Sequence, residues 1–154
     1  MYLSYLKIYI LINNILYIYI FMNIYVNKTI YSELTIDHLK VLLDNTYKKK
    51  PNIDLIIIKF TATWCKPCQK IKELCNNLFG QTSDTTICFD IDIDNNAQLY
   101  TAFKSKKMIK GVPTLYGFNC KKERDMNHWY IPDISISGSN EKDIKQFFAQ
   151  TIEK

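Results

Sequence analysis

The sequence contains few of the residues from which flexible linkers are made. Only four glycines and four prolines occur among its 154 residues, too few for a long linker rich in these residues. No internal repeat is visible, which excludes the repeat architectures. The length therefore suits one domain, and the part after Tyr31 alone is long enough to bury a substantial core.

The chain also lacks the patterns of nucleic-acid-binding and metal-binding proteins. Its formal net charge is +5, but no basic stretch is interleaved with aromatic residues, so we expect no nucleic acid partner. Cys65 and Cys68 have no second close ligand pair, which structural zinc prefers. Asp90, Asp92 and Asp94 alternate along a predicted strand, without the glycine-containing loop and terminal glutamate of a calcium-binding hand. We therefore expect no metal site.

The five cysteines are an odd number, so they cannot all pair within the chain. Three of them remain beside the closely spaced pair, which fits a reducing compartment better than a secreted disulfide scaffold. We expect Cys75 and Cys88 to be small core residues. Cys120 falls in a charged connection, where we expect an exposed thiol that either stays silent or forms disulfides with glutathione or another chain.

The first 26 residues differ from the rest of the chain. From residue 8 to 26 there is no charge, and as a helix this stretch is roughly 28 Å long, about one hydrocarbon core. Three interpretations fit: a signal peptide or membrane anchor, an over-extended reading frame with true initiation at Met22, or an extra element packed on the domain. The sequence thus divides into a hydrophobic segment over 1–26, which is either an anchor or signal or a non-native extension, and a domain over 27–154. If the segment is an anchor, the chain would associate with a membrane through residues 8–26.

Hydrophobic periodicity predicts strands and helices that alternate along the domain. The run over 53–61 is continuously apolar, as in a strand covered on both faces. The order β-α-β-α-β-α-β-β-α predicts an α/β fold, a mixed central sheet flanked by helices. The predicted elements are a short edge strand over 25–31, a helix from Ser32 or Thr35 to about Thr46, strands over 53–61 and 86–93, helices over 69–79 and from 94–96 to Phe103, strands over 114–119 and 128–136, and a final helix that begins after Ser139 or Asn140.

The chain is organised around the stretch from Thr63 to Lys70. Cys65 and Cys68 follow the apolar strand and begin a helix. Unpaired backbone N–H groups at a helix N-terminus favour thiolate over thiol, and lower the pKa of such a cysteine from about 8.5 to about 7. A second thiol one turn later can close an intramolecular disulfide. Trp64 would shield this site on one side, and Pro67 would stiffen the first helical turn.

At these residues the chain resembles the thioredoxin family. The stretch WCKPC, with Lys66 between the first cysteine and the proline, is similar to the WCGPC of that family. Gly111-Val112-Pro113-Thr114 resembles the family's cis-proline loop and follows in the same order. The resemblance covers roughly residues 30–152 and implies a thioredoxin-like sandwich.

The resemblance implies thiol–disulfide exchange. Cys65 would attack a partner disulfide and Cys68 would resolve the mixed disulfide. No nucleotide-binding motif is present, so we expect no bound cofactor and a separate NADPH-dependent, thioredoxin-reductase-like electron donor. The partners would be disulfide-containing proteins, which dock on Trp64, Pro67, the Val112 backbone, Pro113 and Thr114. Lysines over 104–110 beside this loop would favour acidic partners.

Lys59 departs from the family, whose members carry a buried aspartate at the equivalent position, where it assists proton transfer to the second cysteine. A buried lysine is costly unless it is paired. Its candidate partner is Asp90 on the next strand, so that acid and base exchange places beneath the site. The alternative is that Lys59 extends to the surface at the strand end. A charged lysine close to the thiols would favour thiolate.

Two other functions remain open from the sequence. One is a disulfide oxidase or isomerase of a secretory compartment, and the other is a non-catalytic binding subunit with a thioredoxin-like surface. The Lys66-Pro67 pair keeps the proline of reducing members, so we expect a reduction potential nearer about −270 mV than about −120 mV. This favours a reductase, which would be cytoplasmic, or membrane-anchored or secretory if residues 1–26 are genuine.

Overall fold

The computed structural model describes residues 29–44, 46 and 52–152. The prediction for residues 1–26 therefore lies outside the described residues. Within the described ranges, no helix is both long and apolar enough to cross a membrane. The elements, in chain order, are β1 (Ile30–Tyr31), α2 (Ile36–Leu43), β2 (Leu55–Thr61), α3 (Lys66–Lys70), α4 (Lys72–Gly80), β3 (Thr86–Asp92), α5 (Ala97–Ser105), β4 (Thr114–Asn119), β5 (Ile134–Ser137) and α6 (Glu141–Ile152).

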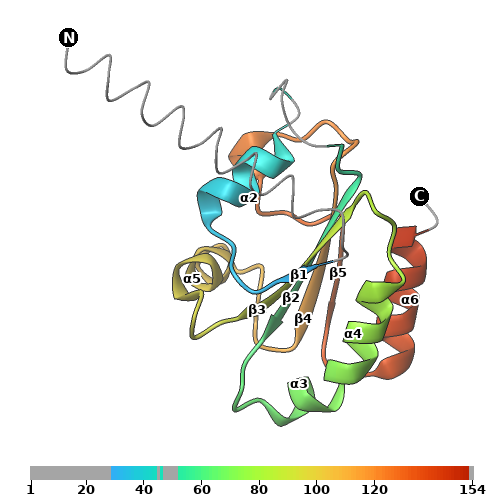
Figure 1. The fold of residues 1–154 in the computed structure, drawn as a ribbon. Coiled ribbons are helices and arrows are strands. Elements are labelled where there is room, and N and C mark those ends of the chain that lie inside the picture. The colour runs from blue at the N-terminus through green and yellow to red at the C-terminus, as the bar shows by residue number, and fades with distance from the viewer. Residues whose placement is uncertain (1–28, 45, 47–51, 153–154) are drawn as a thin grey trace.

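The strands form one five-stranded mixed sheet in the order β1-β3-β2-β4-β5. β3 runs parallel to both β1 and β2, whereas β4 runs antiparallel to β2 and β5. Helices α2 and α5 cover one face, and α3, α4 and α6 lie at the other (Figure 1). The predicted α/β sandwich is therefore confirmed. Its centre is β2, which is hydrogen-bonded along both edges.

Alternate side chains of β2 enter two separate cores, because successive residues of a strand point to opposite faces. Ile56, Ile58 and Phe60 join the core beneath α2 and α5. Ile57 joins the core beneath α4 and α6. The helical spacing predicts four inward residues of α6, and the second core includes three of them: Ile144, Phe147 and Phe148. The side chain of the fourth, Ile152, lies outside what the structure describes.

Local capping sets several helix boundaries. The Thr35 hydroxyl accepts the backbone N–H of His38, as predicted, but α2 ends at Leu43 rather than near Thr46. Asn140 caps α6, since its side-chain oxygen accepts from the N–H groups of Lys142 and Asp143. Gly138 forms the preceding turn with a φ of 102°, a left-handed conformation that suits glycine.

The predicted helix over 69–79 is two helices, α3 and α4, which meet at Ile71. Ile71 ends α3 and begins α4 with a ψ of 0°, which interrupts the α-helical geometry. Its side chain is fully buried in the second core. The break therefore lets the short helix that carries the cysteines take its own direction.

The prediction of a strand over 128–136 is wrong for its first half. Residues Met126–His128 form a 3₁₀ turn that Asp125 caps, and β5 begins only at Ile134. The Asp125 carboxylate also lies 2.7 Å from His128 Nδ1, and this hydrogen bond lowers the pKa of Asp125. The turn brings Trp129 into the core. Its side chain is buried there and packs edge-on against Phe103.

Cys120 is also placed differently from its prediction. Its side chain is 4% exposed, and its backbone N–H donates to the Asp54 carbonyl. It is therefore a core residue at the end of β4, not an exposed thiol.

Gly117 allows β4 and β5 to approach each other closely. A Cβ added there would lie 2.6 Å from Ile134 Cγ2 and 3.3 Å from Thr151 Cγ2. We expect Gly117→Ala to lower the free energy of unfolding by about 1–3 kcal/mol through overpacking. Gly80→Ala is the matched control, because a Cβ at Gly80 meets nothing within 4 Å, and it should change stability by less than about 1 kcal/mol. Urea unfolding of both variants checks this; equal stabilities would contradict it.

Candidate active site

The two cysteines of the motif form a disulfide where α3 begins. Cys65 and Cys68 are joined with a Cα–Cα distance of 5.2 Å. Cys65 is the N-cap of α3, and its Sγ accepts the backbone N–H of Cys68 at 3.2 Å. Pro67 lies in the first helical turn, where its missing N–H leaves no bond unmade. An N–H group aimed at Sγ is the contact that stabilises a thiolate when the disulfide opens.

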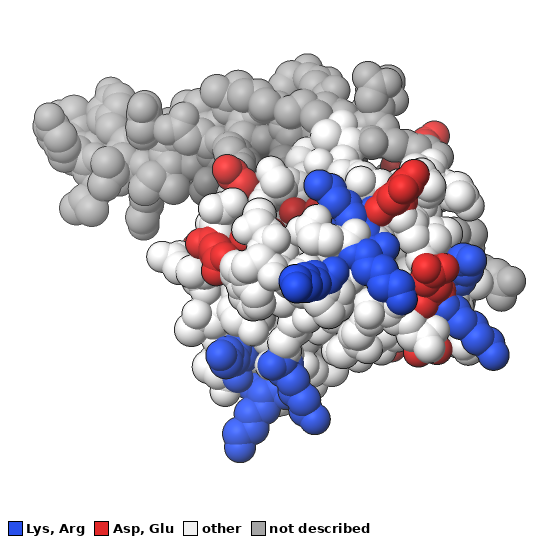
Figure 2. All heavy atoms as spheres, turned by 90° about the horizontal axis from the view of Figure 1, so that it is seen from below, with Lys and Arg blue, Asp and Glu red and all other residues white. Residues whose placement is uncertain are grey.

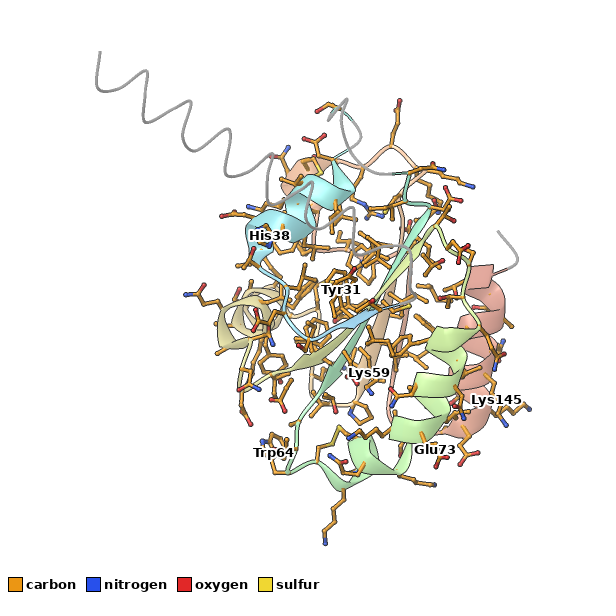
Figure 3. The ribbon with its side chains drawn as sticks, viewed as in Figure 1. Tyr31, His38, Lys59, Trp64, Glu73 and Lys145 are labelled. Carbon is orange, nitrogen blue, oxygen red and sulfur yellow. A yellow bond between two sulfur atoms is a disulfide. The ribbon has the colours of Figure 1, made fainter. Side chains whose placement is uncertain are left out.

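The loop that carries the cysteines has an apolar side chain in solvent. Trp64 is 65% exposed, although its Nε1–H donates to the Asp94 carboxylate at 2.9 Å (Figure 3). The Gln69 side chain donates to the Thr63 carbonyl at 3.3 Å. The loop is thus held in shape while the indole face stays available. Neither supporting residue, Asp94 nor Gln69, is predicted from the sequence, because no local sequence motif indicates these two hydrogen bonds.

A second loop faces the disulfide. The Val112–Pro113 peptide bond is cis, as the resemblance implies, and the Val112 carbonyl oxygen lies 3.6 Å from Cys65 Sγ. Thr114, predicted to bind the partner, is 1% exposed, and its hydroxyl donates to the Gly111 carbonyl at 2.8 Å. Gly138 N–H donates to the Pro113 carbonyl. Thr114 and Gly138 therefore hold this loop from behind.

Lys59 and Asp90 form an ion pair inside the sheet. Lys59 Nζ lies 2.9 Å from Asp90 Oδ2, and the two residues are register partners of β2 and β3. The Lys59 side chain is 1% exposed and that of Asp90 is 23% exposed. The predicted pairing is confirmed, and Lys59 does not extend to the surface. Asp90 Oδ1 is buried and has no hydrogen-bond partner among the described residues.

Cys75 lies on α4 in the core on the same face of the sheet as this pair. Burial raises the pKa of its thiol to about 11, while the Lys59 charge lowers it and the Asp90 charge raises it. Cys88 is also buried, as predicted, and its Sγ lies 3.6 Å from the Thr82 hydroxyl. The three remaining cysteines are thus buried thiols, and the disulfide joins Cys65 and Cys68.

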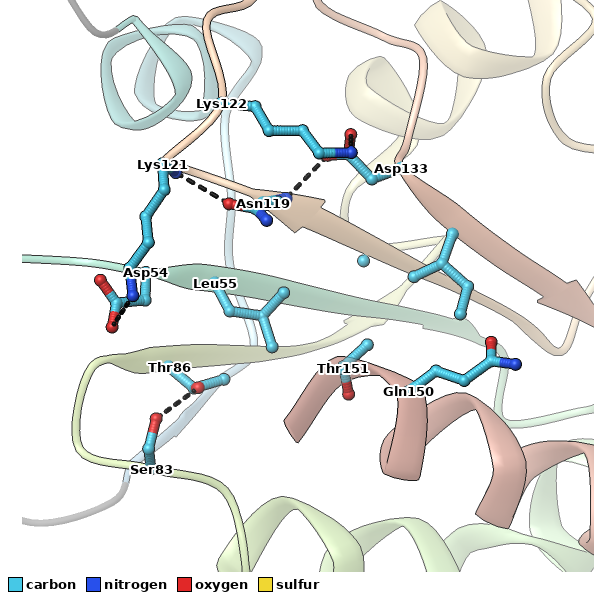
Figure 4. Close-up of a pocket in the computed structure, with 12 residues that line it drawn as sticks. Asp54, Leu55, Ser83, Thr86, Asn119, Lys121, Lys122, Asp133, Gln150 and Thr151 are labelled. Atoms are coloured by element: carbon cyan, nitrogen blue, oxygen red, sulfur yellow. Dashed lines mark hydrogen bonds and ion pairs between the residues drawn. The ribbon is translucent and has the colours of Figure 1, made fainter. Parts of the chain in front are cut away.

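The described residues show no candidate metal centre, since no three of their His, Cys, Asp or Glu side chains form a group that could hold a metal ion. A cavity of about 130 Å³ lies at the opposite end of the sheet (Figure 4). Its lining includes Asp54, Leu55, Asn119 and Lys121. Leu55 begins β2, whereas the cysteines follow the end of that strand, so the cavity is separate from the disulfide.

The disulfide lies at the start of a helix, and a cis-proline loop faces it. This arrangement places the molecule among the thioredoxin-fold thiol–disulfide proteins. The thioredoxin family model matches residues 38–149. The chain belongs to the thioredoxin family.

Two curated relatives and one solved structure illustrate the similarity. Thioredoxin 3 of Plasmodium falciparum is 36% identical over 94 residues, which cover 60% of this chain and 46% of that protein. The match thus spans about half of that relative. A thioredoxin of Ictalurus punctatus is 31% identical over 93 residues, covering 60% of this chain and 75% of that protein. The structure of thioredoxin from Trypanosoma brucei brucei has a TM-score of 0.59 at 19% identity, covers 82% of this chain and 94% of that one, and shares the fold.

The burial of Cys75, Cys88 and Cys120 predicts that the protein with an intact disulfide has no rapidly reactive thiol at pH 8. Ellman's reagent should report no fast thiol in the native state and three in concentrated guanidinium. A fast-reacting thiol in the native protein would contradict the burial of these side chains.

Cys75 also predicts a loss of stability at alkaline pH. The unfolded thiol ionises near 9.0 and the folded one near 11, so between these values the folded state binds the extra proton. The free energy of unfolding therefore falls as pH rises, by up to about 3 kcal/mol. Denaturant titrations of wild type and Cys75→Ala at several pH values check this. The difference in the free energy of unfolding between wild type and Cys75→Ala should change over this pH range. A constant difference would refute the assignment of the effect to Cys75.

Proposed function

We propose that this protein reduces disulfides of partner proteins by dithiol–disulfide exchange at Cys65 and Cys68. The observation that supports it most directly is the geometry at Cys65 Sγ, which meets the Cys68 N–H at 3.2 Å and the Val112 carbonyl at 3.6 Å. One contact favours a thiolate, and the other places the backbone of an open loop beside it. Family membership supports the same activity.

The reaction proceeds in two exchanges. In the reduced protein the Cys65 thiolate attacks one sulfur of the partner disulfide, and the other sulfur leaves as a thiolate that takes up a proton. Cys68 then loses its proton and attacks Cys65 Sγ, which releases the second partner thiolate. The Cys65–Cys68 disulfide forms as the partner disulfide breaks, so two electrons and the proton of Cys68 pass to the partner, and solvent supplies the second proton that makes both partner sulfurs thiols.

The partner segment docks on the surface formed by both loops. Trp64 offers an exposed apolar face, and Lys66 and Pro67 are exposed beside it. The Val112 backbone pairs with an extended segment next to the attacked disulfide. We propose that a separate NADPH-dependent reductase restores the dithiol, since the reduction of the Cys65–Cys68 disulfide needs two electrons from outside the chain.

Cysteine variants test this function. Cys65→Ser should abolish reduction of an insulin disulfide, because the attacking thiolate is missing. Cys68→Ser should abolish turnover but accumulate a mixed disulfide with the partner, visible on a non-reducing gel. Cys75→Ala is the matched control and should retain activity, since its thiol lies buried outside the exchange. A wild-type protein that binds partners without reducing them would instead indicate a binding subunit.

The reduction potential separates a reductase from an oxidase or isomerase. Equilibration of the full chain against glutathione should give a value near −270 mV, whereas a value near −180 to −120 mV would indicate an oxidising or isomerising protein.

We further propose that Lys59 acts as a positioning residue for the dithiol. It lies in the strand whose end leads directly into the cysteine loop, and it is held by Asp90 in a region from which water is excluded. An ammonium group in such a region acts over longer distances than one in water. Lys59 therefore favours the thiolate form of the nearby pair.

Lys59→Met should raise the thiol pKa values of the reduced protein and lower its stability by about 3 kcal/mol, because it leaves the Asp90 carboxylate unpaired in a mostly buried position. The pH dependence of iodoacetamide alkylation and urea unfolding measure the two effects. The double variant Lys59→Met/Asp90→Leu should recover the stability, since both buried charges are gone. If Lys59→Met leaves both thiol pKa values and the stability unchanged, the proposal fails.

A further inference from the structure

We infer that the preferred partners carry their disulfide in an acidic, extended segment. This inference rests on the proposed function and adds a substrate class to it. It is based on the uncompensated positive charge of the two segments that meet at the disulfide.

Charge is strongly segregated along the sequence. Residues 61–72 contain three lysines and no acidic residue, and residues 95–122 contain six lysines and no acidic residue. The first of these segments carries Cys65, and the second carries Val112, whose carbonyl lies 3.6 Å from Cys65 Sγ. The fold therefore brings the two acid-free segments together at the reactive sulfur.

The seven lysines of these two segments other than Lys121 and Lys122 are exposed, and within the described residues no ion pair neutralises their charge. Among residues 29–44, 46 and 52–152, no carboxylate forms an ion pair with any of them; they are Lys66, Lys70, Lys72, Lys104, Lys106, Lys107 and Lys110. Two of them lie over aromatic rings, Lys104 over Tyr100 and Lys106 over Tyr130. A ring contact leaves the positive charge in place.

The Asp94 carboxylate, which accepts the Trp64 Nε1–H at 2.9 Å, lies at the cysteine loop and offsets one of these positive charges. Figure 2 looks onto the end of the molecule that carries α3, where basic side chains gather in groups, and the group at its lower left has no acidic side chain beside it. The surface around the disulfide therefore presents a positive potential with little internal compensation.

The opposite end of the sheet shows the contrast. There Lys121 Nζ lies 3.1 Å from Asp54, and Lys122 Nζ lies 3.2 Å from Asp133 (Figure 4). Both lysines belong to the same acid-free segment of the sequence, yet the fold supplies each with a carboxylate. The lysines left uncompensated in this segment are thus those over residues 104–110, which lead into the loop that faces the disulfide.

An acidic segment is the partner that this charge pattern fits. Positive potential around a reactive site raises the association rate of a negatively charged partner, and the effect weakens as salt shortens the Debye length to about 8 Å at physiological ionic strength. A basic segment meets repulsion at the same surface. The segment is extended because it pairs with the Val112 backbone beside its disulfide.

Three disulfide peptides test this directly: they share one disulfide loop and differ in flanking residues, which are Glu, Ser or Lys. With the full chain in its reduced form, rate constants from stopped-flow Trp fluorescence should fall in the order Glu, Ser, Lys. We expect the rate constants for the Glu and Lys peptides to differ by about tenfold at low ionic strength and by about twofold in about 0.5 M salt. Equal rates for the three peptides would overturn the inference while leaving the proposed function intact. Failure to reduce any of them would overturn the proposed function itself.

Two charge-matched variants locate the effect. Lys107→Gln/Lys110→Gln removes two uncompensated lysines near the disulfide and should reduce the preference for the Glu peptide by about threefold or more, with the Ser peptide little affected. Lys121→Gln/Lys122→Gln removes the same charge at the far end and should keep the preference. If both double variants lose it equally, net charge rather than this surface is responsible, and the inference fails.

Discussion

The whole arrangement depends on the pairing of β2 with a strand on each side. β3 runs parallel to it and β4 antiparallel, so residues 55–60 pair with backbone on both edges. The side chains between its two end residues are buried. Because β2 ends where β4 begins, the cysteine loop and the cis-proline loop necessarily emerge at the same end of the sheet. The contact between Cys65 Sγ and the Val112 carbonyl follows from that antiparallel pairing.

The same constraint explains the buried ion pair. A residue in the middle of β2 cannot reach solvent, so a lysine at position 59 needs a partner on a neighbouring strand. The parallel register supplies Asp90 directly opposite, at 2.9 Å. A pair of this kind contributes little net stability over an apolar pair of similar size, since desolvation offsets the attraction. We propose that its value to the protein lies in placing a fixed charge in the strand that leads to the dithiol.

Elements with a strong local signal were predicted well from the sequence. The apolar run of β2, the Thr35 and Asn140 caps and the amphipathic pattern of α6 each follow from interactions within a few residues. The predictions for residues 128–130 and for Cys120 failed for a different reason. Trp129 and Cys120 have polar or charged neighbours in the sequence, but both side chains lie in the first core. Nothing adjacent in the sequence indicates that burial.

The sequence by itself determined the chemistry of the site: two cysteines at a helix start after an apolar strand, a Val-Pro loop later in the chain, and a lysine that needed a partner. These follow from residue type and spacing, because thiolate stabilisation and strand burial are local effects. The tertiary structure alone decided which lysines meet a carboxylate, that Asp94 holds Trp64, that Thr114 and Gly138 support the proline loop, and that Cys120 is withdrawn from solvent. Those outcomes depend on distances between residues far apart in the chain, and only the packed sheet sets such distances.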